Sequence, residues 1–296
     1  MYKIVRKEEL AANIILMDVE APRVAKSCLP GQFIIARIDE EGERIPLTIC
    51  DYDREKSIIT IVVQTIGAST ERMNELNEGD AFLDFVGPLG VPSEFCQEEN
   101  LEETKKLNLV FIAGGLGAAP VYPQVKWLHE QGVTPDVIIG AKTKDILILE
   151  EEMAAASNLH IATDDGSYGF KGMVTGCLED LVKNQGMNFD LCVSIGPMIM
   201  MKFVCKLTEQ LNIPTIVSMN PIMVDGTGMC GACRLVVDGK VKFACVDGPE
   251  FDGHKVDFDQ AMKRMKLYKT EEGRAMLKLQ EGDTHHGGCG NCGGDK

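Results

Sequence analysis

The sequence has no long hydrophobic run and comparatively little positive charge. Its longest apolar segments, such as Leu107–Ala113, are far too short to span a bilayer, and no signal peptide opens the chain. Thirty Lys and Arg residues stand against 45 Asp and Glu residues, which gives a formal net charge of −15. A chain this acidic is poorly suited to bind nucleic acid or an anionic membrane. We therefore expect neither nucleic-acid binding nor a membrane span.

Acid–base catalytic machinery is also missing from the sequence. We find no Ser–His–Asp arrangement and no glycosidase-like pair of carboxylates, so we predict no catalytic acid or base. Cysteine, by contrast, is plentiful, with 11 in a chain that has no export signal. This indicates a cytoplasmic protein whose thiols serve metal or redox chemistry before disulfides. Six cysteines are scattered and are interpreted as small core residues: Cys28, Cys50, Cys96, Cys177, Cys192 and Cys205.

The densest group of reactive side chains lies in a glycine-rich stretch near residue 230. Asp225, Cys230, Cys233 and Cys245 have the spacing D-x4-C-x2-C-x11-C. With Cys in place of Asp, this is close to the C-x4-C-x2-C…C spacing of a [2Fe–2S] ferredoxin site. The glycines between them let the backbone wrap a small inorganic core and present amide N–H groups. We predict a [2Fe–2S] cluster held by these four residues.

The residues that follow the loop predict a β-hairpin. Residues 234–237 and 240–245 flank an Asp-Gly turn, so the second strand would return Cys245 to the loop. Two alternatives remain at this stage. The set could bind zinc, which also takes cysteine ligands, or Asp225 could cap the loop while another residue ligates the metal. If Asp225 is a ligand, its less covalent bond to iron should shift the cluster's reduction potential.

The first hundred residues predict a small antiparallel barrel. Short apolar segments alternate with Pro- and Gly-containing turns, and long helices are lacking. Expected strands cover residues 14–20, 32–38, 45–50, 57–63 and 81–86, and one helix covers residues 69–76.

Two motifs in this region carry chemistry suited to a phosphate-bearing ligand. Arg44 and Thr48 lie on one face of a strand, where a guanidinium can bind pyrophosphate and a hydroxyl can bond a ring nitrogen or carbonyl. The stretch Gly67-Ala-Ser69-Thr70 opens a helix and offers amides, hydroxyls and a positive dipole end to a phosphate. The alternative is that Arg44 is a solvated surface charge and Ser69 only caps the helix.

The middle of the chain alternates strands with helices, which predicts a parallel sheet covered on both faces. The first strand, residues 107–113, is almost continuously apolar and runs into a glycine-rich turn, where such sheets bind dinucleotides. The remaining expected elements are strands over 136–140, 158–162, 191–195 and 215–218 and helices over 150–156, 174–183 and 198–211.

Three turns of this predicted sheet meet at its carboxyl edge and form a candidate NAD site. The 164–169 turn offers no Arg or Lys cluster to a 2′-phosphate, and its two aspartates would repel one, which favours NAD over NADP. The candidate residues are Gly114, Gly115, Gly117, Asp164, Asp165, Gly166, Ser167, Gly196, Pro197 and Met198.

Taken in this order, the motifs of residues 1–253 resemble one family of the ferredoxin–NADP reductase superfamily. It contains the electron-transfer subunit of NAD-dependent dihydroorotate dehydrogenase and the small subunit of NADH-dependent reduced ferredoxin:NADP oxidoreductase, also called a sulfide dehydrogenase subunit. The resemblance implies that the glycine loop binds the NAD pyrophosphate, that residues 164–167 lie near the adenosine and that residues 196–198 approach the nicotinamide. Pro46 stands where many members have Tyr. The implied FAD-binding residues are Arg44, Pro46, Leu47, Thr48, Gly67, Ser69 and Thr70.

The resemblance also implies a domain plan. It comprises an FAD-binding β-barrel over residues 1–100, a Rossmann-like NAD-binding α/β domain over 101–220 and a [2Fe–2S] domain over 221–253. A helical segment and a Cys- and Gly-rich tail follow over 254–296. The pair Cys289 and Cys292 in that tail could bind metal or contact a partner, and we assign it no function.

The implied function is electron transfer between NAD(H), FAD, a [2Fe–2S] cluster and a larger flavin and iron–sulfur partner subunit. Asp225 favours the electron-bifurcating ferredoxin:NADP oxidoreductase branch, which is expected to have Asp there and whose partner subunit handles ferredoxin and NADP(H). The dihydroorotate dehydrogenase branch is expected to have Cys. From a different class, the chain could be a non-enzymatic redox sensor or zinc-binding interaction module.

Overall fold

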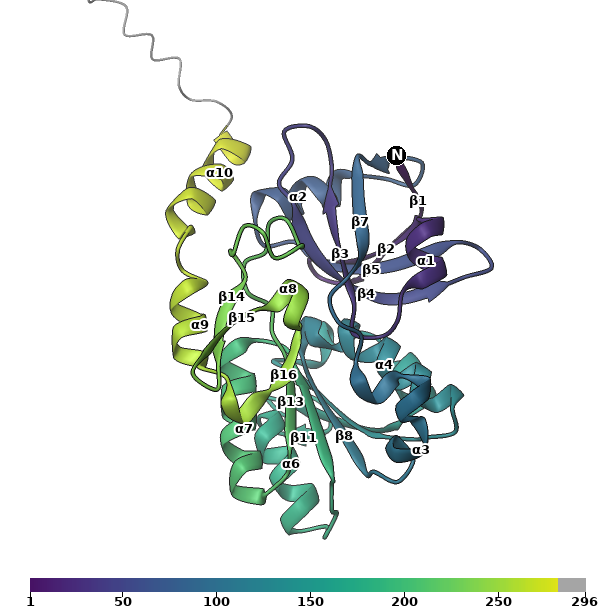
Figure 1. The fold of residues 1–296 in the computed structure, drawn as a ribbon, viewed down its shortest axis with the longest axis vertical. Helices are drawn as coiled ribbons and strands as arrows, with labels where there is room; N and C mark the ends of the chain where they lie inside the picture. The colour runs from purple at the N-terminus through teal and green to yellow at the C-terminus, as the bar shows by residue number, and fades with distance from the viewer. Residues whose placement is uncertain (282–296) are drawn as a thin grey trace, which may run out of the picture.

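The computed structural model describes residues 1–281 and contains two seven-stranded sheets and one hairpin (Figure 1). The first sheet is the predicted antiparallel barrel, nearly closed, with strand order β6-β1-β2-β5-β4-β3-β7. Its strands are β1 (Tyr2–Ala11), β2 (Ile14–Glu20), β3 (Phe33–Arg37), β4 (Ile45–Asp53), β5 (Ile58–Gln64), β6 (Ala81–Phe82) and β7 (Asp84–Leu89).

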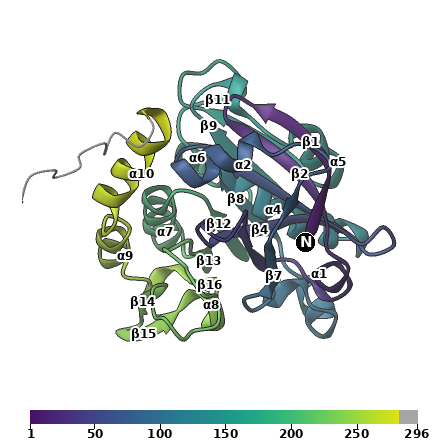
Figure 2. The same cartoon turned by 90° about the horizontal axis from the view of Figure 1, so that it is seen from above.

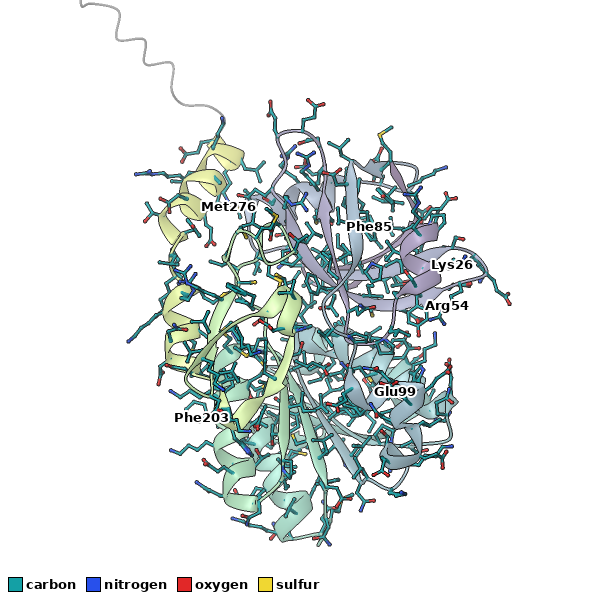
Figure 3. The ribbon with its side chains drawn as sticks, in the orientation of Figure 1. Lys26, Arg54, Phe85, Glu99, Phe203 and Met276 are labelled. Atoms are coloured by element: carbon teal, nitrogen blue, oxygen red, sulfur yellow. The ribbon has the colours of Figure 1, made fainter. Side chains whose placement is uncertain are left out.

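The barrel is filled by the inward-facing side chains of these strands. Phe82 and Phe85 pack inside it with their ring centroids 6.0 Å apart and their planes tilted by 42°, and Phe85 is labelled in Figure 3. Two elements of the barrel region, β1 and α1 (Pro22–Ser27), were not expected from the sequence. Strand β1 has only Ile4 buried and is held by pairing with β2, so it carries little apolar signal. Helix α1 is a single short segment with proline in its first turn.

The second sheet is parallel except at one edge and has strand order β11-β10-β9-β8-β12-β13-β16. All six residues of β8 are buried, in agreement with its apolar sequence. The short antiparallel strand β16, which the sequence did not predict, joins β13. The strands are β8 (Leu109–Gly114), β9 (Asp136–Ala141), β10 (Asn158–Thr163), β11 (Phe170–Lys171), β12 (Leu191–Ile195), β13 (Thr215–Ser218) and β16 (Glu250–Asp252).

Helices cover both faces of this sheet (Figure 2). Alternate residues of β8 point to opposite faces of the sheet. On one face, Phe111 packs with α4 (Ala118–Glu130) and α5 (Glu150–Ala156). On the other face, Ile112 packs with α6 (Val174–Lys183) and α7 (Met198–Leu211). This layering leaves the carboxyl ends of the parallel strands open for a ligand.

The last described part of the chain contains the hairpin and three helices. Strands β14 (Arg234–Val237) and β15 (Lys240–Phe243) pair as predicted, but β15 ends at Phe243, and Cys245 lies in the short helix α8 (Ala244–Asp247). The predicted helical segment forms α9 (Phe258–Arg264) and α10 (Lys269–Glu281), and α10 lies beside α2 (Ala68–Glu75) without burying a residue (Figures 1 and 2). Short 3-10 turns join several elements: Glu94–Cys96, Glu98–Asn100, Gly115–Gly117, Lys144–Ile146 and Gly253–Lys255, with the helical turn α3 (Leu101–Thr104) after the second.

Over residues 1–281, no helix combines the length and hydropathy needed to cross a membrane. Cys289 and Cys292 lie outside the described residues. The six scattered cysteines are all buried, as expected for core residues.

Candidate functional site

The loop 225–233, which we call the cluster loop, is folded around the side chain of Asp225. Its carboxylate accepts hydrogen bonds from the amides of Thr227 (3.2 Å), Met229 (3.1 Å) and Cys230 (3.3 Å). Glycines 226, 228 and 231 have φ values of +78°, +85° and +66°, so a side chain there would strain the turn. Although desolvation raises it, the pKa of Asp225 falls to about 2 because hydrogen bonds from Cys230 and Thr227 outweigh that effect.

The four predicted metal ligands lie in two pairs. Cys230 Sγ is 3.2 Å from Asp225 Oδ1, and Cys233 Sγ is 3.3 Å from Cys245 Sγ. Cys230 is exposed, whereas Cys233 and Cys245 are each 2% exposed. Within residues 1–281, no three His, Cys, Asp or Glu side chains converge on one point as a single metal ion would require.

This division into two pairs fits a two-iron cluster better than a single zinc ion. A [2Fe–2S] cluster takes two protein ligands on each iron, whereas a structural zinc ion takes all four ligands in one tetrahedron. Asp225 with Cys230 would hold one iron, and Cys233 with Cys245 the other. Burial, with the neighbouring Cys233 thiol, raises the pKa of Cys245 to about 12, so its ligating thiolate form needs a cation beside it.

Arg44, the predicted flavin residue, lies against the cluster loop. It immediately precedes β4 and donates from Nε to the carbonyl of Val224 (2.8 Å) and from Nη2 to the carbonyl of Asp225 (3.5 Å). Its guanidinium also lies 3.9 Å from Asp84. Arg44 is therefore neither isolated nor simply solvated: it joins the start of the barrel strand to the candidate cluster site.

The other predicted flavin residues lie on β4 and at the start of α2. Thr70 caps its own helix, because its Oγ1 accepts from the amides of Ile66 and Gly67, both at 3.0 Å. Ser69 donates a hydrogen bond to Glu43, the residue before Arg44. Three further residues are half-buried on β4 and pair with β3: Pro46, Leu47 and Thr48.

The glycine turn after β8 and the turn after β12 touch each other at the carboxyl edge of the sheet. A Cβ on Gly117 would lie 2.1 Å from the carbonyl oxygen of Ile195, and one on Gly196 would lie 3.0 Å from the carbonyl oxygen of Gly114. A Cβ on Gly114 would meet Pro197 at 3.1 Å, and Met198 begins α7 just beyond. Two of the three predicted NAD turns thus lie in contact, because glycines occupy the positions where they meet.

The third predicted NAD turn, residues 164–167, is exposed and bonded within itself. Asp165 Oδ1 accepts from Ser167 N (2.9 Å) and Oγ (2.7 Å), and the hydrogen bonds from the hydroxyl and amide of Ser167 lower the pKa of Asp165. Lys144 donates its amide to Ser167 Oγ at 2.9 Å, and the Lys171 side chain lies against Gly166. Sequence reasoning missed these lysines because they lie outside the turn itself, Lys144 in the 3-10 turn after β9 and Lys171 in β11.

A family model for the iron–sulfur cluster binding domain of dihydroorotate dehydrogenase B matches residues 220–257, the segment that holds both ligand pairs. A Thermotoga maritima protein described as a homolog of the dihydroorotate dehydrogenase B (NAD(+)) electron transfer subunit is 44% identical over 270 residues, with 91% of this chain and 92% of the relative covered. The chain belongs to the dihydroorotate dehydrogenase B electron-transfer subunit family. The fold and the family confirm the predicted iron–sulfur, FAD and NAD(H) cofactors, while the residue-level assignments stay predictions.

Two further proteins match this chain over almost its whole length. A Clostridium beijerinckii protein described as an uncharacterized protein in the adh 3′ region is 64% identical over 298 residues, covering 100% of both chains. A chain from a solved structure of the NADH-dependent reduced ferredoxin-NADP oxidoreductase, studied for flavin-based electron bifurcation, is 40% identical with a TM-score of 0.86. That match covers 95% of this chain and 98% of the other. This family member is thus an oxidoreductase subunit of the electron-transfer type.

Proposed function

We propose that this subunit passes electrons between NAD(H) and a larger flavin and iron–sulfur subunit of an electron-bifurcating NADH-dependent ferredoxin:NADP oxidoreductase. When bound, FAD exchanges a hydride with nicotinamide and single electrons with the [2Fe–2S] cluster, so the cofactors supply the redox chemistry. In this proposal, ferredoxin and NADP(H) bind the partner subunit. The chain itself contributes positions and electrostatics, in the cytoplasmic setting that its cysteine content predicts.

The observation that carries the proposal is the contact between Asp225 and Cys230. Their 3.2 Å separation supports Asp225 as an iron ligand in the position where the bifurcating branch is expected to have Asp. The similarity of the whole chain to the solved oxidoreductase structure supports the same branch.

Each proposed binding group has a defined task. Arg44 and Thr48 would orient the flavin nucleotide, with the amides at Gly67–Thr70 against its phosphate. Gly117 lets the turn after β8 pack against the turn after β12, since the Ile195 carbonyl leaves no room for a side chain, and these joined turns would hold the NAD pyrophosphate. The buried pair Cys233 and Cys245 would keep water from one iron, and the exposed Cys230 faces the solvent side, from which a partner can approach.

A second candidate is the electron-transfer subunit of a dihydroorotate dehydrogenase. The names of the relatives favour it: the Thermotoga maritima relative and a 31%-identical Shouchella clausii protein are both described in those terms. In that case the partner would oxidise dihydroorotate, and no second pyridine nucleotide would be involved.

Purification of the native complex, with no affinity tag on the partner subunit, distinguishes these two candidates. We expect flavin absorption bands, a reduced-state EPR signal from one [2Fe–2S] centre, and a co-purifying subunit that supports NADH- and ferredoxin-dependent NADP reduction. A partner that oxidises dihydroorotate with NAD would establish the second candidate. A colourless, zinc-loaded protein would reject both and support a zinc-binding interaction module.

A further inference from the structure

Two arginines from distant parts of the chain donate to backbone carbonyls at opposite ends of the cluster loop. Arg44 Nε lies 2.8 Å from the carbonyl oxygen of Val224, next to the first ligand. Arg264, in α9, donates from Nη2 to the carbonyl of Ala232 at 3.2 Å, next to Cys233. The chain has a net charge of −15, so two positively charged side chains beside one short loop are a local exception to its acidic composition.

Neither guanidinium is fully neutralised by a nearby carboxylate. Asp84 lies 3.9 Å from Arg44 but only 2.7 Å from Arg37, so its charge is shared and mainly paired with Arg37. Arg264 is half-buried, and its Nε has no hydrogen-bond partner among residues 1–281. Positive charge therefore persists beside the loop in partly desolvated surroundings, where screening is weaker than in water.

The loop is also pinned to the barrel by packing. A Cβ on Gly226 would lie 2.7 Å from Leu89 Cδ1 and 2.8 Å from Ile35 Cδ1, so the backbone touches these barrel side chains directly. The two arginine contacts and this close approach keep the loop at a constant distance from both guanidinium groups. The electrostatic effect of each guanidinium on the reduction potential of a cluster in this loop is therefore also constant.

We propose that Arg44 and Arg264 act as positioning residues that hold the cluster loop from both ends and raise the reduction potential of the cluster. Reduction adds one negative charge to the cluster, and a nearby cation stabilises the more negative state. The inference rests on the proposed ligation by Asp225, Cys230, Cys233 and Cys245.

The test is an EPR-monitored redox titration of the full-length, anaerobically purified protein and its variants Arg44→Gln and Arg264→Gln. Arg54→Gln is the matched control, because Arg54 also donates to a backbone carbonyl, that of Cys28, and touches neither the loop nor the carboxylate beside Arg44. We expect a lower cluster potential in the first two variants, a further decrease in the double variant, and the parent potential in the control. Iron, sulfide and FAD content are measured on each sample.

Potentials equal to the parent in both variants, or an equal shift in Arg54→Gln, would overturn the proposal while leaving the proposed function intact. If a Gln variant loses its iron, Arg44→Lys and Arg264→Lys decide the matter, because they keep the charge and lose the fork geometry. If the Lys variants retain iron and have a reduction potential near that of the parent, the proposal is supported. If both Lys variants lose iron, the proposal that the arginine charge raises the potential is overturned. Failure of the ligation itself is recognised separately, as a cluster that survives Cys233→Ala.

Discussion

Ser93 Oγ donates a 2.6 Å hydrogen bond to Glu250 Oε1, and Gln124 Nε2 donates to the same oxygen at 2.8 Å. The three residues come from the linker after the barrel, from helix α4 and from strand β16. Burial raises the pKa of Glu250 to about 7, and the two hydrogen bonds only partly offset that effect. Glu250 also borders a cavity of about 770 Å³.

This network predicts a pH-dependent stability. The folded pKa of Glu250 lies above its ordinary value of 4.5, so the folded state binds the proton more tightly. The resulting stabilisation is complete below pH 4.5 and is lost as the pH rises through 7. Glu250→Gln should therefore raise the free energy of unfolding at pH 8.5 by on the order of 1–3 kcal/mol, with a smaller gain at pH 5.5.

Urea denaturation of the holoprotein at the two pH values measures this difference. Glu94→Gln is the control, since Glu94 borders the same cavity but is exposed. A stability difference between parent and Glu250→Gln that is the same at both pH values would contradict the prediction.

The buried ligand pair predicts an unequal effect of two cysteine substitutions. Cys233→Ala should remove the iron and the reduced-state EPR signal, because Cys245 alone cannot hold one side of a two-iron cluster. Cys177→Ala replaces an equally buried thiol in α6, far from the cluster loop, and should retain both at a stability loss of about 1 kcal/mol. Iron and acid-labile sulfide analysis compares the two, and equal iron contents would refute the assignment.

Asp225→Cys should retain the cluster and change its reduction potential. Thiolate and carboxylate carry the same formal charge, but the iron–sulfur bond is more covalent, so the electronic structure of the iron changes. Redox titration followed by EPR measures the shift against the parent protein. An unchanged potential would show that Asp225 caps the loop without binding iron.

Gly117→Ala should weaken NADH binding while FAD stays bound. The added methyl group meets the Ile195 carbonyl at 2.1 Å, so one of the two turns must move and the site reshapes. We expect the apparent KM for NADH in reduction of the bound flavin to rise about tenfold or more, equivalent to about 1.4 kcal/mol. Gly273→Ala, at an open position in α10, is the matched control, and an unchanged KM in Gly117→Ala would argue against this turn as the pyrophosphate site.

The elements that the sequence predicted best are those whose own residues carry the signal. Strand β8 is apolar throughout because both of its faces are covered, and the Asp-Gly turn specifies the β14–β15 hairpin. Elements that depend on pairing were missed. Strand β1 buries only Ile4, and β16 has three residues whose place is fixed by β13.

The candidate site shows the same division. Spacing predicted that Asp225, Cys230, Cys233 and Cys245 gather in one region, and the structure places them in two close pairs. The contact of Arg44 with Val224 spans 180 positions, and no local pattern could indicate it. Glu250 was missed for a similar reason, since its partners lie 157 and 126 positions away. A glutamate in an otherwise ordinary three-residue segment carries no signal of burial.

Barrel strand β3 shares a hydrophobic core with the iron–sulfur segment: Phe33 and Ile35 pack in one cluster with Cys233, Leu235 and Cys245. The segment 220–257 is therefore not a portable insert. Grafted onto another reductase, or produced alone as a miniature ferredoxin, it would lose the core residues that β3, α7 and β13 supply and expose apolar surface to water. Exchange of this iron–sulfur unit between proteins requires these elements to travel with it.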